Sequence, residues 1–268
     1  MLGWYLVLTM FVTVNINGVE IEFALVDNKA KIISKFSIST QNKRTDDQYI
    51  TEIKNVFDYL LKVNKAEITH AAILSNVPKF DRIVSDFFKE NIKIDSMVIS
   101  YKDIPSDFYG SINNVTDVPI DIFAGCYACN KRYGSNVVFV NFDTIITFSV
   151  CVDNMFEGYS VFPGLDLLAG AIHSQVAEYP EIVIEATRKS SALDRYNALN
   201  VGVFNGVVGA CDTIIQNILD EYRNKQFKVV ATCKKPELLQ YSRTINLIDP
   251  DLRIKSIIEC AKNKMFGI

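Results

Sequence analysis

The sequence predicts an α/β protein of two domains, each a mixed β-sheet flanked by helices. The order of local patterns is three strands, then helix, strand, helix and strand, and this order occurs twice along the 268 residues. The hydrophobic share of 49% and the charged share of 22% are those of a globular chain, long enough for two cores. We therefore expect duplicated domains over residues 1–117 and 118–268.

The first half begins with a hairpin signal. Asn17 and Gly18 stand between two segments in which apolar and polar residues alternate, a pattern typical of a β-hairpin. Apolar residues then recur at helical spacing between residues 47 and 63. The expected strands are 11–16, 20–26, 32–39, 70–78 and 95–101, and the expected helices are 47–63 and 79–90.

The second half repeats this order after a helix over 119–133. Residues 136–154 are rich in β-branched and aromatic residues and form two strands around residues 141–144. Pro163 and Gly164 mark a turn before the next helix. The remaining expected strands are 157–161, 228–233 and 245–250, and the remaining helices are 165–176, 190–223, 236–242 and a closing helix.

Charge and cysteine content exclude several classes of function. The net charge of −3, with both signs spread along the chain, gives no basic surface for nucleic acid. Cys126 and Cys129 form a CxxC inside an expected helix, but no second CxxC follows. We therefore favour buried thiols in a reducing compartment over a zinc or redox site.

The apolar N-terminal stretch does not predict export or a membrane anchor. Residues 1–14 lack the basic region and the cleavage site of a signal peptide, and they are too short to span a bilayer. Met10 is an alternative start of translation. We expect a cytoplasmic protein without a membrane contact.

Paired domains of this kind place a cleft between two strand turns, each able to hold a nucleotide phosphate. Phosphoryl transfer in such a cleft needs a carboxylate for magnesium, backbone N–H groups for the phosphates and a base for the attacking hydroxyl. These requirements can be searched for by residue type.

Six segments resemble, in order, the motifs of the type III pantothenate kinases. The resemblance extends nearly from end to end. The segments are ISTQNKRTDDQY (38–49), ILSNVP (73–78), VPIDIFAGCYAC (118–129), VNFDTIITFSV (140–150), EGYSVFPGLDL (157–167) and GVFNGVVGACD (202–212).

This resemblance implies two ribonuclease H-like domains of the actin-like ATPase type, with a cleft between them. It implies ATP-dependent phosphorylation of pantothenate to 4′-phosphopantothenate, the first step of coenzyme A biosynthesis. The family uses magnesium and a monovalent cation, K⁺ or NH₄⁺, and acts as a homodimer with the substrate site at the dimer interface.

The resemblance also assigns residues. Asp121 matches the catalytic base, although its position before an expected helix equally fits a helix cap. The positions that match the nucleotide site are Asn15, Asn17, Gly18, Asn141, Asp143, Thr144 and Thr232, and those that match the substrate site are Gly158, Pro163 and Gly164. We assign no metal ligand.

The departures from the family pattern fall on the chemistry. Asn15 and Asn141 replace aspartates, which removes two negative charges from a magnesium site. Asp143 replaces a glycine where phosphate oxygens approach, which adds bulk and repulsion. The hairpin over residues 11–23 is therefore either an altered phosphate loop or a plain type I′ turn.

Three interpretations follow. The chain is an active pantothenate kinase in which Glu20, Glu22 or Asp143 replaces the lost carboxylates, with activity weak or lost. Alternatively it is a non-catalytic paralogue that keeps the fold and dimer as a binding or regulatory protein. The third interpretation is a kinase of the same superfamily that acts on another substrate, and it would lack the same carboxylates. The competing interpretation of Glu20 and Glu22 is that they lie on a solvated strand face. The competing interpretation of Asp143 is that its side chain binds the backbone of its own turn.

Overall fold

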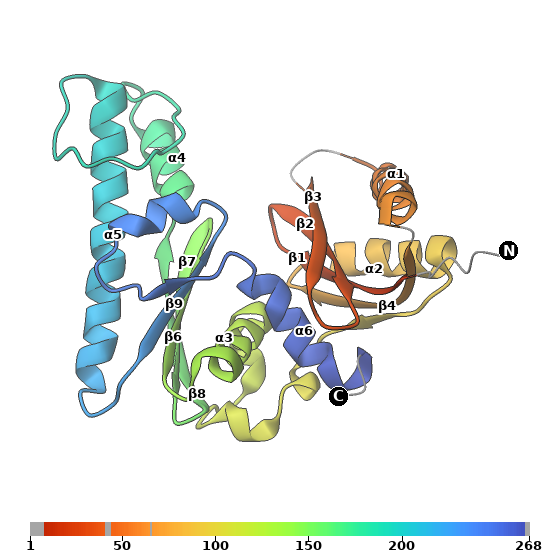
Figure 1. The fold of residues 1–268 in the computed structure, drawn as a ribbon. Helices are drawn as coiled ribbons and strands as arrows, with labels where there is room; N and C mark the ends of the chain where they lie inside the picture. Colours follow the sequence, from red (N-terminus) through yellow and green to blue (C-terminus); the bar gives the residue numbers. More distant parts are fainter. Residues whose placement is uncertain (1–7, 41–43, 65, 266–268) are drawn as a thin grey trace, which may run out of the picture. The chain divides into compact units, whose positions relative to one another are not determined.

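The computed structural model describes residues 8–40, 44–64 and 66–265. The chain forms two compact units (Figure 1). The first contains residues up to 106, residues 114–124 and the chain from 253 onward; the second contains residues 107–113 and 125–252. The assignment of residues 1–117 and 118–268 to two actin-like domains stays a prediction, and the stretch 1–7 lies outside the described residues.

The first unit is built on a five-stranded mixed sheet of order β3-β2-β1-β4-β5. β1 is antiparallel to β2 and β2 to β3, whereas β4 runs parallel to both β1 and β5. The strands are β1 (Leu8–Ile16), β2 (Glu20–Asp27), β3 (Ile32–Ser39), β4 (Ala66–Ser75) and β5 (Ser96–Val98). The helices are α1 (Asp46–Asn64), α2 (Pro78–Phe87), a π-helical turn η1 (Phe88–Ile92) and α6 (Leu252–Met265).

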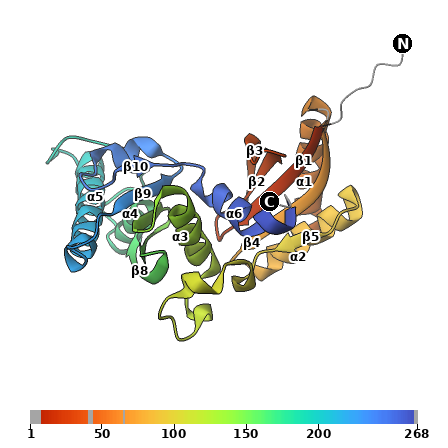
Figure 2. The same cartoon turned by 60° about the horizontal axis from the view of Figure 1, so that its bottom comes forward.

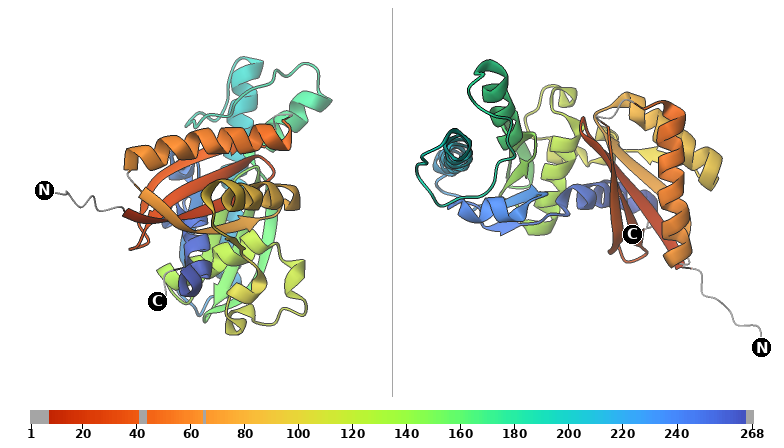
Figure 3. Two further views of the ribbon diagram at one scale, coloured as in Figure 1. Left: turned by 90° about the vertical axis from the view of Figure 1, so that its right-hand side faces the viewer. Right: turned by 90° about the horizontal axis from the view of Figure 1, so that it is seen from above.

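Helices α1 and α2 cover one face of this sheet (Figure 3, left). Alternate residues of β1, among them Val12 and Val14, point into the core, where they meet Tyr49, Ile53 and Phe57 of α1. The remaining face of β1 carries Phe11, Thr13 and Asn15. The core side of each strand is therefore apolar, whereas the other face of β1 combines Phe11 with the buried polar side chains of Thr13 and Asn15.

The second unit repeats the same sheet topology with the order β10-β9-β6-β7-β8. β6 is antiparallel to β7 and parallel to β9, as β1 is to β2 and β4. The strands are β6 (Val137–Phe142), β7 (Ile145–Val152), β8 (Met155–Pro163), β9 (Lys228–Cys233) and β10 (Leu247–Ile248). The helices are α3 (Ile120–Tyr133), α4 (Leu165–Gln175), α5 (Arg195–Glu221) and the 3₁₀ helix η5 (Pro236–Tyr241). Only the part of α3 from residue 125 onward belongs to this unit. Shorter 3₁₀ turns are η2 (Tyr101–Asp103), η3 (Ser106–Tyr109) and η4 (Val115–Asp117).

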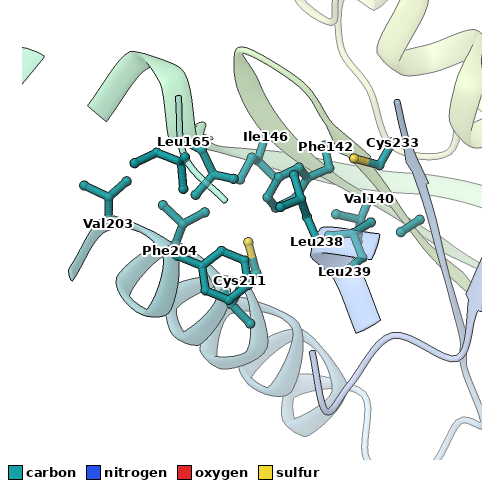
Figure 4. Packing of buried hydrophobic residues seen from close by; sticks show 14 of the residues in the cluster. Val140, Phe142, Ile146, Leu165, Val203, Phe204, Cys211, Cys233, Leu238 and Leu239 are labelled. Carbon is teal, nitrogen blue, oxygen red and sulfur yellow. The ribbon is translucent and has the colours of Figure 1, made fainter. Parts of the chain in front are cut away.

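Helices α4 and α5 pack on one face of the second sheet. Figure 4 shows Phe204 and Cys211 of α5 facing Val140 and Phe142 of β6. The second half of α3 lies on the opposite face, where Gly125 packs so closely on the ring of Phe139 that a Cβ atom would collide with it. Phe139 and Asn141 therefore point away from the α5 core.

The predicted element order is confirmed in both halves. Helix α5 begins at Arg195 rather than at residue 190, because the Asp194 side chain accepts the backbone N–H of Asn197 and caps the helix there. The hairpin of β1 and β2 is confirmed, but the type I′ interpretation of its turn is wrong. A type I′ turn needs positive φ at both central residues, and neither Asn17 nor Gly18 has it.

Candidate functional site

The first candidate turn connects β1 to β2 in the first unit (Figure 2). Its amide groups are bound by the turn itself. The Oδ1 atom of Asn17 accepts the backbone N–H groups of Val19 at 2.8 Å and Glu20 at 2.9 Å, and the Asn17 N–H donates to the Glu20 carbonyl at 3.0 Å. A phosphate at this turn would have to displace the Asn17 side chain.

The structure does not require a glycine at position 18. A Cβ atom at this position would meet nothing within 4 Å, and the φ angle is not positive. The glycine is therefore not held there by the backbone geometry of the turn.

Asn15 lies on β1, one residue before the strand ends. It pairs with Glu22 on β2 and with Leu74 on β4, and it is 5% exposed. The side chain is a neutral amide, so this position carries no charge toward a metal ion.

The second candidate turn, Asp143–Thr144, connects β6 to β7 in the second unit. The Thr144 N–H donates to the Oδ1 atom of Asp143 at 2.9 Å, so this side chain also binds an amide of its own turn. The Gly164 N–H donates to the Thr144 carbonyl at 2.9 Å. A Cβ atom on Gly164 would collide with the Asp143 carbonyl oxygen and lie 2.6 Å from that of Thr144. Pro163 and Gly164 therefore pack directly against the turn.

A row of polar side chains crosses the second sheet next to this turn. Asn141 on β6 pairs with Thr232 on β9 and with Thr147 on β7, so the three side chains share one face. Their oxygen atoms Asn141 Oδ1, Thr147 Oγ1 and Thr232 Oγ1 are buried and have no hydrogen-bond partner within the described chain. Unpaired buried oxygens of this kind usually bind water or a ligand. The row is neutral, so it offers no carboxylate to a divalent ion.

Asp121 lies in the first turn of α3. Its Oδ1 atom accepts the backbone N–H of Ile122 at 2.8 Å, and an acidic side chain is favourable at the positive end of a helix. The helix begins at Ile120, so Asp121 is its second residue and the N-cap interpretation is wrong, while a role as catalytic base stays a prediction. The side chain is only partly exposed.

The structure brings six of the predicted site residues of the second unit to one end of its sheet. These are Asn141, Asp143, Thr144, Pro163, Gly164 and Thr232. Gly158 is not among them. It pairs with Val150, whereas Pro163 pairs with Ile145, and five residues of β-strand separate the two positions by about 16 Å. The site roles of all these residues stay predictions.

The cysteines do not add reactive groups to the site. All six are buried, and none of them forms a disulfide. Burial raises the pKa of Cys151 and of Cys211 to about 12 and holds the pKa of Cys126 well above its usual value, so these thiols stay protonated at neutral pH. Within the described ranges, no three His, Cys, Asp or Glu side chains are grouped to hold a metal ion.

Helix α5 is long and apolar enough to cross a membrane by length and composition. Its buried residues, including Phe204, Val207 and Ile215, pack in the core of the second unit. Half of the apolar window is buried in this way, as in a core helix of a globular unit.

Comparison with known proteins agrees with this arrangement. The sequence model of a family described as type III pantothenate kinase matches residues 14–217. A type III pantothenate kinase of Fusobacterium nucleatum is 26% identical over 227 residues, which cover 83% of this chain and 87% of the relative. A second, from Paramagnetospirillum magneticum, is 22% identical over 254 residues, covering 93% and 96%.

Solved structures show the same fold at low identity. A conserved putative Baf family transcriptional activator from Campylobacter jejuni aligns with a TM-score of 0.53 at 14% identity, over 94% of this chain and 98% of the other. The ethanolamine utilization protein EutJ from Carboxydothermus hydrogenoformans aligns with a TM-score of 0.53 at 10% identity, over 94% and 89%. These likenesses support the actin-like ATPase fold.

Proposed function

Since this chain belongs to the type III pantothenate kinase family, we propose that it transfers the γ-phosphoryl group of ATP to pantothenate at a strongly reduced rate. The observation that carries the proposal is the family match over residues 14–217, a range that includes Asp121 in the first turn of α3. The family's label places the reaction at the start of coenzyme A synthesis.

Asp121 is the proposed base. A carboxylate in this place would accept the proton of the pantothenate hydroxyl as the oxygen attacks the phosphoryl group. The contact with the Ile122 N–H uses one carboxylate oxygen and leaves the lone pairs of the second for a substrate hydroxyl.

The loss of charge argues for a slow enzyme. ATP is bound with Mg²⁺, which in kinases neutralises charge that develops on the phosphates. Asn15 and Asn141 do not fit a magnesium site made of two carboxylates. At an effective dielectric constant of about 20, one unit charge 4 Å from another contributes about 4 kcal/mol. A loss of that size corresponds to a factor of about 10³ in rate. For K⁺ or NH₄⁺ we assign no residue.

The two turns add a second barrier to nucleotide binding. Phosphate loops present free backbone N–H groups to the phosphates. Here Asn17 binds two such groups and Asp143 binds one. Asp143 also places a carboxylate where phosphate oxygens would approach.

A homodimer is supported by an apolar groove on the second unit, lined mainly by side chains of α4 and α5. The groove has a volume of about 520 Å³. Gly202 and Gly206 form part of its floor, where an added Cβ atom would meet nothing within 4 Å. Leu167, which precedes the groove residue Leu168 in α4, is 45% exposed. An open apolar surface of this kind fits a second copy of the chain. Six buried cysteines without a disulfide among them support a reducing, cytoplasmic compartment.

The backbone N–H groups of the two turns are already hydrogen-bonded to Asn17 and Asp143, and this favours a second candidate function. A non-catalytic paralogue needs the fold and the dimer but not free phosphate loops. In this case the residues of the two turns would bind a ligand or partner without turnover.

Calorimetric titration with ATP and Mg²⁺, followed by pantothenate and a turnover assay, separates the two candidates. A slow kinase binds both ligands and releases ADP in a pantothenate-dependent manner, and Asp121→Asn lowers that rate by about 10²-fold or more. The matched control Asp117→Asn changes a neighbouring acidic residue outside α3 and leaves the rate unchanged. A folded protein that binds pantothenate without turnover supports the non-catalytic candidate.

A further inference from the structure

The carboxyl ends of β6 and β9 combine buried polar groups with two lysines that have no role in the proposed reaction. The two strands run parallel and end side by side at Phe142 and Cys233, which Figure 4 shows at the same end of the sheet. In open α/β sheets, ligands bind outside the carboxyl ends of parallel strands. We therefore expect a ligand at this end of the second sheet.

The strand register places a lysine beside the aspartate of the second turn. Phe142 and Cys233 are the last paired residues of β6 and β9, and both belong to the core on the α5 side. The next residues are Asp143 and Lys234, so these two begin neighbouring loops from strands about 5 Å apart. Lys234 and the following Lys235 are exposed, so a dissolved anion can reach both.

The two lysines change the charge that an anion meets at this turn. Asp143 contributes one negative charge, and Lys234 and Lys235 contribute two positive charges. An ammonium group has three N–H donors, so a contact between Lys234 and a carboxylate leaves donors for a phosphate oxygen. The carboxylate of Asp143 therefore does not prevent this end of the sheet from binding phosphate.

Buried hydroxyl groups next to the lysines are an independent sign of a ligand. Thr232 and Thr147 are 0% and 2% exposed, and both pair with Asn141. Their Oγ1 atoms have no hydrogen-bond partner within the described residues. A buried hydroxyl without a partner is rare in native proteins and calls for an unplaced water, ion or ligand. Since residues two apart in an extended chain point the same way, a ligand at Lys234 lies next to the Thr232 hydroxyl.

We propose that Lys234 and Lys235 form a phosphate site that works without a divalent metal. Their ammonium groups supply the positive charge that Mg²⁺ supplies in other kinases. The ligand is a di- or triphosphate, because only adjacent phosphate groups can contact both lysines. The inference rests on the proposed function, since it explains how a turn with Asn141 in place of a carboxylate holds ATP.

The competing explanation is that the lysines only balance nearby carboxylates. Lys234 would then serve Asp143, and Lys235 would serve Glu237 in the first turn of η5. The Lys235 N–H donates to the Cys233 sulfur at 3.3 Å, and its carbonyl accepts the Leu238 N–H at 3.0 Å, so the backbone of this residue has a structural role without its side chain. In that case removal of either ammonium group affects stability alone.

The test is an NMR titration of the full chain with ATP, once with EDTA and once with Mg²⁺, in the absence of pantothenate. We expect ATP to bind at least as tightly with EDTA, because Mg²⁺ cancels part of the charge that the lysines attract. Lys234→Gln and Lys235→Gln are each expected to weaken the binding of ATP and of inorganic triphosphate about five- to tenfold. The control Lys228→Gln, an equal charge change at the opposite end of β9, leaves binding unchanged.

Tighter ATP binding with Mg²⁺ than with EDTA overturns the proposal, as does a wild type that binds neither ATP nor triphosphate. Unchanged affinity in either lysine variant also overturns it, and should Lys234→Gln fail to fold, Lys235→Gln gives the answer. Metal-free ATP binding without ADP release on addition of pantothenate keeps this inference and removes the slow kinase. ADP release with Mg²⁺-dependent binding does the reverse.

Discussion

At the scale of single residues, the side-chain oxygens of Asn17 and Asp143 matter most. Each binds backbone N–H groups of its own turn, the groups with which a phosphate loop holds a nucleotide. The sequence identifies an asparagine and an aspartate in these two turns, and both turns differ there from the family motifs. It does not predict the hydrogen bonds that these side chains make, because the bonds depend on turn conformations that the sequence pattern does not specify.

Gly164 provides a prediction at this scale. A Cβ atom there would overlap backbone oxygens of Asp143 and Thr144, which cannot move as a flexible side chain can. We expect Gly164→Ala to lower the free energy of unfolding by about 2–3 kcal/mol and to displace the Asp143–Thr144 turn. Urea denaturation measures the first effect, and the amide shift of Thr144 in NMR spectra reports the second.

Gly209 is the matched control for this substitution. It lies in α5, and an added Cβ atom would meet nothing within 4 Å. Gly209→Ala is expected to raise the free energy of unfolding by about 0.5–1 kcal/mol, since alanine is the better helix former. Equal destabilisation by the two variants would contradict the role given to Gly164.

At the scale of elements, the hydrophobic periodicity predicted nearly every helix and strand. Residues 32–39 and 228–233 form β3 and β9 with the expected bounds. The last strand was less predictable: β10 contains only Leu247 and Ile248. The chain on either side of it is held by side-chain contacts from other elements, which no local pattern contains.

Asp212 of α5 makes one set of those contacts. Its carboxylate accepts the hydroxyls of Ser242 at 2.5 Å and Thr244 at 2.8 Å, and the backbone N–H of Arg243 at 3.0 Å. It thereby fixes the segment that leads from η5 to β10. The sequence resemblance included Asp212 only as part of a helical motif and gave it no role.

We expect Asp212→Ala to lower the free energy of unfolding by about 2–4 kcal/mol, because several donors lose a charged acceptor at once. Asp220→Ala is the control on the same helix. Asp220 is exposed, and its carboxylate accepts only the Gln216 side chain one turn away, while Arg223 donates to its backbone carbonyl; a change within about 0.5 kcal/mol is therefore expected. Denaturant titration of both variants measures the two free energies of unfolding. Similar free energies for the two variants would show that Asp212 does not stabilise the segment between η5 and β10.

At the scale of the whole molecule, the two sheets share one topology. β1 and β6 occupy the same central place, each antiparallel to the next strand and parallel to a later one. The sequence predicted this duplication from the order of elements alone. It could not predict that Glu22 stands opposite Asn15, since strand register is set by pairing across the sheet.

The proposed homodimer has its own test. Leu167→Asp places a charge next to the groove between α4 and α5 and is expected to yield monomers in light scattering after size-exclusion chromatography. Tyr59→Asp, an equally drastic change at a 66% exposed site on α1, is expected to leave the dimer intact. A wild-type protein that is monomeric at micromolar concentration would contradict the dimer.

The central claim is that lost carboxylates and occupied turn amides limit nucleotide binding. Calorimetric titration with ATP and Mg²⁺ tests it most directly when wild type is compared with the triple variant Asn15→Asp, Asn141→Asp, Asp143→Gly. The triple variant restores two charges and one free amide, so we predict an affinity at least about 100-fold higher than that of wild type. Equal affinities, or micromolar ATP binding by the wild type itself, would contradict the account.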